Sequence, residues 1–256
     1  MEYKERRYRG QFAAEGRRSF CVKFLESDLW IGVDNGSYSP SMEDDALQLI
    51  VDLRRAMDAH IMLEPDFRTS LVPYRVAECA HPVMRHMSDV SFRTGIGPMS
   101  AVAGAFAEHV AVHLREKYGC QEVIVENGGD IYADSSSDMD ISVFAGESQL
   151  SNRVGFHIPA GEFPLGICSS SGTVGPSLSF GRADAVMIVC KDALLADSYA
   201  TAFANRIKTV DDLQPVIDLI AAHSDILAAI AIKDDRMAMC GRYELRIFKN
   251  LESVLK

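Results

Sequence analysis

A run of small residues in the first half of one helix constrains this fold more than any other feature of the sequence. Residues 94–99 form a glycine-bearing turn, TGIGPM, and the residue spacing predicts a helix over residues 100–117. Five positions at the start of this helix carry almost no side chain: Ala101, Ala103, Gly104, Ala105 and Ala107. Another helix, a sheet or a ligand can therefore approach this helix closely.

The sequence leaves open which of these partners approaches the helix. A helix N-terminus behind glycines binds anions through its free N–H groups and its dipole, but close helix packing needs the same small residues. The segment is not a phosphate-binding P-loop, because no G-K-S/T follows it. The G-x-G followed by Pro98 is not the dinucleotide-binding fingerprint either.

Strand and helix patterns follow one another along the chain without strict alternation, which is typical of an α+β fold. A period of two predicts a hairpin over residues 19–33 with its turn at residues 26–28, and apolar spacing predicts a helix from Ser41, its N-cap, to about residue 60. We expect further helices at 83–91, 193–208 and 211–222, strands at 122–125, 141–145, 154–158, 163–168 and 185–190, and a closing antiparallel sheet of strands at 226–232, 237–240 and 243–248. An internal duplication is compatible with this order but is not established by it.

The charge balance limits the partners of the chain. With 26 Lys and Arg against 36 Asp and Glu, the 256 residues carry a net charge of −10, and the basic residues are scattered apart from residues 4–9 and 17–18. Nucleic-acid binding needs clustered basic residues that release counterions, so we expect no nucleic-acid partner. The hydrophobic fraction of 48% is that of a packed globular protein, and the length allows one large domain or two small ones.

The cysteines and the first residues indicate a cellular compartment. The six cysteines lie far apart and form no C-x-x-C pair, so we expect most of them to be small buried hydrophobes in a reducing compartment. Residues 1–10 lack the apolar core of a signal peptide, and no stretch reaches the roughly 18 apolar residues of a membrane span. We therefore expect a cytoplasmic protein without a membrane partner.

The first candidate binding segment is Asn127-Gly128-Gly129-Asp130, at the end of a predicted strand. Two glycines in series allow positive φ and bring N–H groups against a ligand, while Asn and Asp supply an amide and a carboxylate. A plain hairpin turn is the alternative. The polar run at 134–140 favours a ligand-binding turn, because a tight hairpin would not need both glycines and that excursion.

The second candidate is the pair Asp197 and Thr201 on the helix predicted over residues 193–208. Residues four apart face the same side of a helix, so the carboxylate and the hydroxyl converge on one point. Two hard oxygens at this spacing suit Mg²⁺, which takes few protein ligands. The alternative is an exposed helical acid beside a threonine that bonds its own backbone.

A third polar segment, residues 169–173, contains serines followed by Gly172. A serine nucleophile is conceivable there, but the G-x-S-x-G motif is absent and the sequence names no base. His109 and His113 lie four residues apart, as zinc ligands can, but they have no H-E-x-x-H frame and are expected to be structural.

Together, these segments resemble the ApbE-like superfamily, whose best-known members are the FAD:protein FMN transferases. The match covers residues 94–206 in the same order: a small-residue helix start, a strand ending in G-G-D, a Ser-Gly loop, and a strand followed by a helix that carries D-x-x-x-T. The runs GIGPMSAVAG at 95–104 and ENGGD at 126–130 resemble a cytoplasmic branch without an assigned activity. The resemblance implies one ApbE-like α+β domain over residues 1–256, with antiparallel or mixed sheets packed with helices.

The resemblance implies that Mg²⁺ is held as in the transferases, and that its ligands in this chain are Asp197, Thr201 and a main-chain oxygen close to Val102. The metal bridges the diphosphate of FAD while FMN passes to a hydroxyl acceptor. The resemblance likewise points to FAD or FMN as cofactor. The residues expected to bind it lie in the three glycine-bearing segments: Gly97, Met99, Gly104, Asn127, Gly128, Gly129, Asp130, Ser171 and Gly172.

The chain departs from the transferases at two motifs. It has Val102-Ala103-Gly104 where they carry A-K-G, so the lysine is missing, and residues 177–182 lack the H-x-x-D-P-x-T-G motif. The leading hypothesis is therefore a protein that binds a flavin nucleotide or another phosphorylated small molecule through Mg²⁺. An active FMN transferase and a non-catalytic binding or assembly protein are the alternatives. The catalytic residues stay unassigned, and assembly into a homo-oligomer stays open.

Overall fold

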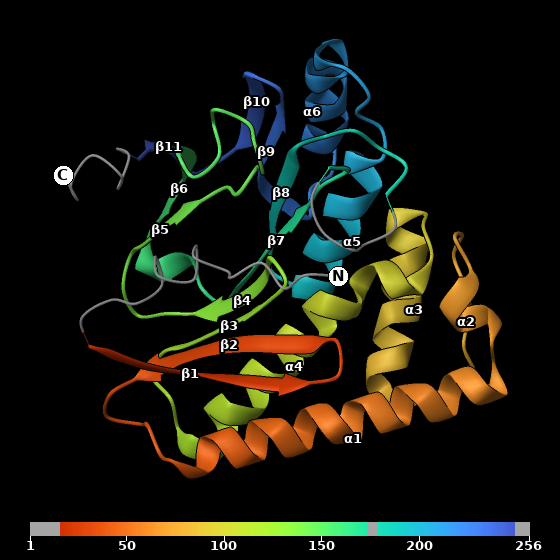
Figure 1. Ribbon diagram of the computed structural model, residues 1–256, viewed down its shortest axis with the longest axis vertical. Helices are drawn as coiled ribbons and strands as arrows, with labels where there is room; N and C mark the ends of the chain where they lie inside the picture. Colours follow the sequence, from red (N-terminus) through yellow and green to blue (C-terminus); the bar gives the residue numbers. More distant parts are fainter. Residues whose placement is uncertain (1–15, 174–178, 249–256) are drawn as a thin grey trace.

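Two antiparallel sheets and a layer of helices make up the described part of the chain, residues 16–173 and 179–248 of a computed structural model (Figure 1). The large sheet has eight strands in the order β1-β2-β3-β4-β7-β8-β9-β10, and the small sheet has the order β11-β6-β5. Helices α1, α3, α4 and α5 lie along one side of the large sheet. The predicted α+β class, with antiparallel sheets packed with helices, is confirmed.

The elements have the following bounds. The strands are β1 Arg17–Phe24, β2 Ser27–Asp34, β3 Val123–Asn127, β4 Asp130–Asp134, β5 Met139–Ser142, β6 Val154–Ile158, β7 Leu165–Ser170, β8 Ala185–Cys190, β9 Ile226–Lys233, β10 Arg236–Gly241 and β11 Glu244–Ile247. The helices are α1 Ser41–Leu63, α2 Asp66–Thr69, α3 Pro82–Thr94, α4 Val102–Tyr118, α5 Ala193–Ala204 and α6 Leu213–Ala221, with the 3-10 turns η2 Pro98–Ala101, η3 Ala160–Glu162 and η4 Val210–Asp212. None of the helices in these ranges is long and apolar enough to span a membrane.

The central strands of the large sheet are buried on both faces. Successive strand residues point to opposite sides, so Ile31 and Val125 pack toward the helices, while Trp30 and Ile124 pack toward the small sheet. Phe156 on β6 belongs to the same cluster as Trp30 and Ile124, between the two sheets, and is fully buried. The helices are thereby held on one face of the large sheet and the small sheet on the other.

The Asn127–Asp130 segment is a tight hairpin turn, so the expectation that it differs from one is wrong. Asn127 pairs with Asp130 across the ladder, and Gly128 and Gly129 have φ of 75° and 106°. Positive φ at both central positions is the pattern of a type I′ hairpin, which explains the two glycines. The strand that follows, β4, was not predicted. The polar run at 134–140 begins only at the last residue of that strand.

Other boundaries also differ from the prediction. The first hairpin turns earlier, at residues 25 and 26, and Leu25 takes a φ of 54° there. Pro40, not Ser41, is the N-cap of α1, which has no side-chain capping hydrogen bond; the Ser41 hydroxyl lies 2.9 Å from the Tyr118 hydroxyl instead. The last strand, β11, pairs with β6 of the small sheet instead of closing a sheet with β9 and β10.

Close packing explains the small residues of α4. A Cβ added at Gly104 would lie 2.4 Å from the Ala193 carbonyl oxygen and 3.0 Å from the Asp197 Cβ, both on α5. Helix α5 in turn crosses so close to the sheet that a Cβ at Gly166 would meet the Ala193 Cα at 2.3 Å. The two helices and β7 therefore approach one another at positions where only a residue without a side chain fits.

We predict that Gly104→Ala destabilises the protein by about 1–3 kcal/mol, because α4 must move away from α5 to admit the methyl group. Urea unfolding followed by circular dichroism measures this change. Gly161→Ala is the matched control, since an added Cβ there meets nothing within 4 Å. Equal stability of the two variants would contradict the close-packing explanation.

Candidate functional site

Four segments meet where α4 begins: the start of α4, the β3–β4 turn, the end of β7 and the middle of α5. The predicted metal ligands and several predicted cofactor residues come from these segments. Hydrogen bonds between the segments, described below, bring residues that lie far apart in the sequence into one region.

The carboxylate of Asp197 caps the start of α4. Its Oδ2 accepts a hydrogen bond from the Gly104 N–H at 2.9 Å, and the Ala103 N–H also donates to this carboxylate. The Val102 N–H donates to the Met99 carbonyl. The N–H groups that open α4 are thus used within the protein, and Asp197 is itself the anion at this helix N-terminus.

Asp130 is the second buried carboxylate of the site. It lies at the start of β4, is 7% exposed, and its Oδ1 has no hydrogen-bond partner among the described residues. Burial raises the pKa of Asp130 well above its usual range, the charges of Asp197 and Glu126 raise it further, and a hydrogen bond from the Ser169 N–H opposes them. Burial also raises the pKa of Asp197 to about 7, against the two N–H groups that lower it. The two carboxyl groups therefore lie where negative charge is unfavourable.

Thr201 lies one turn after Asp197, and its hydroxyl donates to the Ser170 Oγ at 3.3 Å. Because the proton is directed to Ser170, the lone pairs of the Thr201 oxygen stay available to a cation. The Asn127 side-chain amide donates to the Ala103 carbonyl at 3.2 Å. This bond joins the end of β3 to the first turn of α4, beside the Asp197 carboxylate.

Two predicted cofactor residues are held by local packing before α4. A Cβ added at Gly97 would lie 1.8 Å from the Ser70 carbonyl oxygen, so the turn rests on the loop that follows α2. The Met99 side chain packs, partly buried, against the helix-side core. The role of both residues in binding stays a prediction.

The glycines and Ser171 at the other predicted positions border the site differently. Gly128 is exposed at the tip of the β3–β4 turn, and a Cβ added at Gly129 would come within 3.8 Å of the Ser169 carbonyl oxygen. Ser171 and Gly172 follow β7, and the Gly172 N–H donates to the Ala183 carbonyl at 2.9 Å. The β3–β4 turn therefore faces β7, whereas the Ser-Gly loop is bonded to the segment before β8.

Two further residues of this region lie in segments that the sequence analysis singled out, but they were not predicted as site residues. Glu126 is fully buried, and its Oε1 accepts the Gly129 N–H at 2.7 Å, which fixes the turn. Ser170 receives the Thr201 proton. A charged residue inside the apolar strand VIVEN is the signal that could have identified Glu126.

The donor set fits a magnesium ion better than a metal held by side chains alone. In the described ranges, no three side chains of His, Cys, Asp and Glu are grouped so that they could hold a metal ion. Mg²⁺ uses one or two carboxylates and takes its other ligands from water, phosphate or other oxygens. Asp197 and Thr201 carry oxygen donors of this kind, and Asp130, whose Oδ1 has no hydrogen-bond partner in the described ranges, is close enough to Asp197 for its charge to raise the pKa of Asp130.

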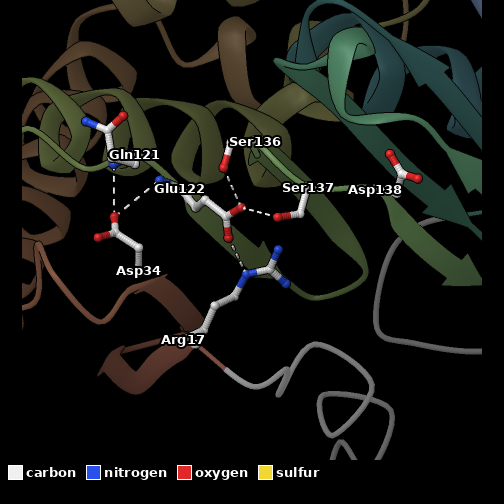
Figure 2. Close-up of a pocket in the computed structure, with 8 residues that line it drawn as sticks. Arg17, Asp34, Gln121, Glu122, Ser136, Ser137 and Asp138 are labelled. Carbon is white, nitrogen blue, oxygen red and sulfur yellow. Dashed lines mark hydrogen bonds and ion pairs between the residues drawn. The ribbon is translucent and has the colours of Figure 1, made fainter.

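A polar cavity of about 350 Å³ lies elsewhere, between the start of β1, the end of β2 and the segments before β3 and after β4. None of the predicted site residues lines it. Figure 2 shows the Glu122 carboxylate held between the Arg17 guanidinium and the hydroxyls of Ser136 and Ser137, at 2.8, 2.9 and 2.9 Å. Asp34 likewise accepts the main-chain N–H groups of residues 121 and 122. Glu122 is therefore bonded to two serines of the polar run at 134–140, whereas Asp138 of that run accepts the Ala160 N–H at 2.9 Å.

Comparison with known proteins identifies the class to which this chain belongs, the ApbE-like proteins. The family model described as AbpE bacteria matches residues 10–231, and the chain belongs to this family. A UPF0280 protein from Methanocella arvoryzae is 37% identical over 196 residues, which cover 77% of this chain and 79% of the relative. Another UPF0280 protein, from Methanoculleus marisnigri, is 42% identical over 188 residues, or 73% and 75% of the two chains. The relatives' names assign no activity.

Two solved structures share the fold. The flavin transferase ApbE from Vibrio cholerae aligns with a TM-score of 0.52 at 10% identity, covering 88% of this chain and 96% of the other. The ApbE protein from Thermotoga maritima aligns with a TM-score of 0.52 at 11% identity, covering 84% and 94%. The resemblance to the ApbE-like superfamily is thereby confirmed for the family and the fold.

We predict that Glu122→Gln lowers the free energy of unfolding at pH 7 by roughly 1–3 kcal/mol, the range for hydrogen bonds to charged groups. Burial raises the pKa of Glu122, but the hydrogen bonds from Arg17, Ser137 and Ser136 outweigh it and lower the pKa to about 2. A depressed carboxyl pKa stabilises the fold above its unfolded value of 4.5, and this stabilisation is lost as the pH falls toward 2. The free energies of unfolding of the wild type and of Glu122→Gln should therefore converge as the pH falls from 7 to 2. A difference between them that stays constant over this range would contradict the assignment.

We predict the opposite sign for Asp197→Asn in metal-free protein. The pKa of Asp197 is raised from 3.8 to about 7 on folding, so this carboxyl group destabilises the fold progressively as the pH rises between these two values and by a constant amount above about 7. Urea unfolding in EDTA at pH 8 should show the variant to be more stable by roughly 1–3 kcal/mol, since it no longer buries the charge. At pH 5, where the folded protein holds Asp197 protonated, the gain should shrink. A loss of stability at pH 8 would contradict the unfavourable charge described here.

Proposed function

We propose that this chain binds Mg²⁺ and, through it, a flavin nucleotide or another phosphorylated small molecule. Asp197 and Thr201 would be the side-chain ligands, with a main-chain oxygen close to Val102. The observation that carries the proposal is the buried pair Asp130 and Asp197. One oxygen of Asp130 has no hydrogen-bond partner in the described part of the chain. Burial raises the pKa of each carboxyl group and outweighs the hydrogen-bond donors that lower it. A divalent cation would neutralise the negative charge that these two carboxyl groups carry when they are ionised.

The charges around the site support a metal as the bridge to the phosphates. The first N–H groups of α4 are bonded to Asp197, and the Gly129 N–H is bonded to Glu126, so these donors do not attract an anion in the protein as it stands. With a net charge of −10, the chain needs a local positive charge to hold a diphosphate. Bound Mg²⁺ supplies that charge and stabilises negative charge on phosphoryl oxygens.

The catalytic half of the transferase pattern is reduced in this chain. Ala103 stands where the transferases carry lysine, and its main-chain oxygen accepts the Asn127 amide. The D-P-x-T-G motif is missing from residues 177–182, of which 177 and 178 lie outside the described residues. Within the described part of this segment, the Arg182 N–H donates to the Ile207 carbonyl. These differences favour ligand binding over FMN transfer as the retained activity.

Isothermal titration calorimetry and thermal unfolding with FAD or FMN, each with and without MgCl₂, test the proposal. We expect magnesium-dependent flavin binding that stabilises the wild type by about 2.7 kcal/mol at a ligand concentration of 100 times Kd. Asp197→Asn should abolish the binding. Asp218→Asn, a change in an exposed acid whose Oδ1 bonds Gln214 within α6, should preserve it.

The same experiment separates the alternatives. Unchanged magnesium-dependent binding in Asp197→Asn would refute the metal assignment. Covalent flavin on a Thr- or Ser-bearing acceptor, with loss of FAD, would identify a working transferase. A protein whose unfolding none of the flavins or Mg²⁺ affects would be a non-catalytic one that keeps the fold.

A further inference from the structure

Three hydroxyl groups, one fully and two partly buried, form a link beside the proposed metal ligands. Ser198, the residue after Asp197 on α5, is fully buried. Its Oγ lies 2.7 Å from the Thr94 Oγ1 at the end of α3 and 2.7 Å from the Ser100 Oγ in η2. Ser100 donates to the Gly97 carbonyl at 2.7 Å, and Thr94 donates to the Val90 carbonyl at 3.0 Å. One side chain thus joins α3, η2 and α5.

These groups have fewer protons than contacts. Three hydroxyls carry three protons, whereas four contacts need one each: two between hydroxyls and two with carbonyls. The Gly97 carbonyl also accepts the Ser100 N–H, and the Val90 carbonyl accepts a main-chain N–H in the regular pattern of α3. Whichever contact lacks a proton, neither buried carbonyl is left unpaired. The link therefore holds the three elements together in more than one proton arrangement.

The position of Ser198 on α5 relates this link to the proposed site. At about 100° per residue, Asp197, Thr201 and Ser198 all fall within one sector of about 100° of the helix. Asp197 bonds the first turn of α4 at Gly104, and Ser198 bonds Ser100 in the turn just before it. Adjacent residues of α5 therefore hold both ends of the segment that contains Val102.

We propose that Ser198 is a positioning residue for the magnesium site: through Ser100 it fixes the turn before α4 relative to Asp197 and Thr201. Ser198 does not touch the ion in this assignment. It acts as the supporting groups of other metal sites do, by orienting the atoms that bind. The inference rests on the proposed function, because the positioned atoms are its metal ligands, and it adds a residue that neither candidate motif contains.

Ser198→Ala tests the assignment in the full-length protein. The two remaining hydroxyls keep their carbonyl partners, so the variant leaves no buried polar group unpaired. We expect calorimetry with MgCl₂ alone to give a Kd raised roughly ten-fold, the lower end of the effect of losing a supporting group at a metal site. Thr94→Ser, which retains the hydroxyl, should bind Mg²⁺ as the wild type does.

Ser91→Ala is the matched control. Ser91 is also fully buried, and its hydroxyl also bonds two partners, the Ser88 carbonyl at 2.6 Å and the Tyr74 N–H at 3.3 Å, but neither partner belongs to α5. If only the loss of a buried hydroxyl mattered, both serine variants would lose stability and neither would lose metal affinity. We expect Ser91→Ala to retain the wild-type Kd for Mg²⁺.

Amide hydrogen exchange in metal-free protein gives a readout that does not depend on binding. In Ser198→Ala the Ala103 and Gly104 amides should exchange roughly five-fold faster, as expected for the loss of about one hydrogen bond, while amides of β9 keep their wild-type rates. Uniform acceleration across the protein, or no change at Gly104, would overturn the positioning role.

The two readouts distinguish the two possible failures. If the wild type binds Mg²⁺, Asp197→Asn does not, and Ser198→Ala binds as the wild type does, the Ser198 assignment is refuted and the proposed function stands. If the wild type does not bind Mg²⁺, the proposed function is refuted, and with it the metal-positioning role, even where faster exchange at Gly104 reveals that Ser198 holds the turn.

Discussion

The hydrogen bond between the Asp197 carboxylate and the Gly104 N–H is the contact on which the rest of the site depends. It closes the start of α4 with a side chain from α5, and it forms only because Gly104 has no Cβ to keep the helices apart. Once the helices are in contact, the carboxylate is buried and its pKa rises to about 7. Packing and electrostatics are thus set by one pair of residues: the geometry that holds the helices together also buries a charge that invites a cation.

Much of the fold follows from local patterns, because they record burial directly. Periods of two and of three to four residues identified most strands and helices, and the small residues of α4 indicated close approach. Strand β4 was missed, because a glycine turn and a polar run bracket it, and the partner of β11 was wrong, because pairing between distant strands leaves no local mark. A hairpin turn also looks the same in sequence whether or not it faces a ligand.

The candidate site could be predicted only in part. The Asp197–Thr201 spacing identified two groups that lie one turn apart on α5, since helix geometry fixes which residues share a side. What the spacing could not reveal is the surroundings of these groups: the occupied N–H groups of α4, the unpaired Asp130 oxygen, and the hydroxyls around Ser198 all arise from contacts between segments far apart in the chain. The charges and hydrogen bonds around these two groups are set only when folding brings the distant segments together.

The strand order has a consequence for how the chain is made. The large sheet pairs mostly neighbouring strands, but the small sheet needs β11, which pairs with β6 only after β7 to β10 have been synthesised. Until β11 emerges from the ribosome, β6 has β5 as its only neighbour in that sheet among the described strands, and one edge of the sheet remains open. Long-range pairings form late, and an unpaired strand edge invites aggregation. Pairing with β11 covers the edge of β6 and moves the open edge to β11, whose residues are exposed, so β6 is most open to wrong pairing before β11 is in place.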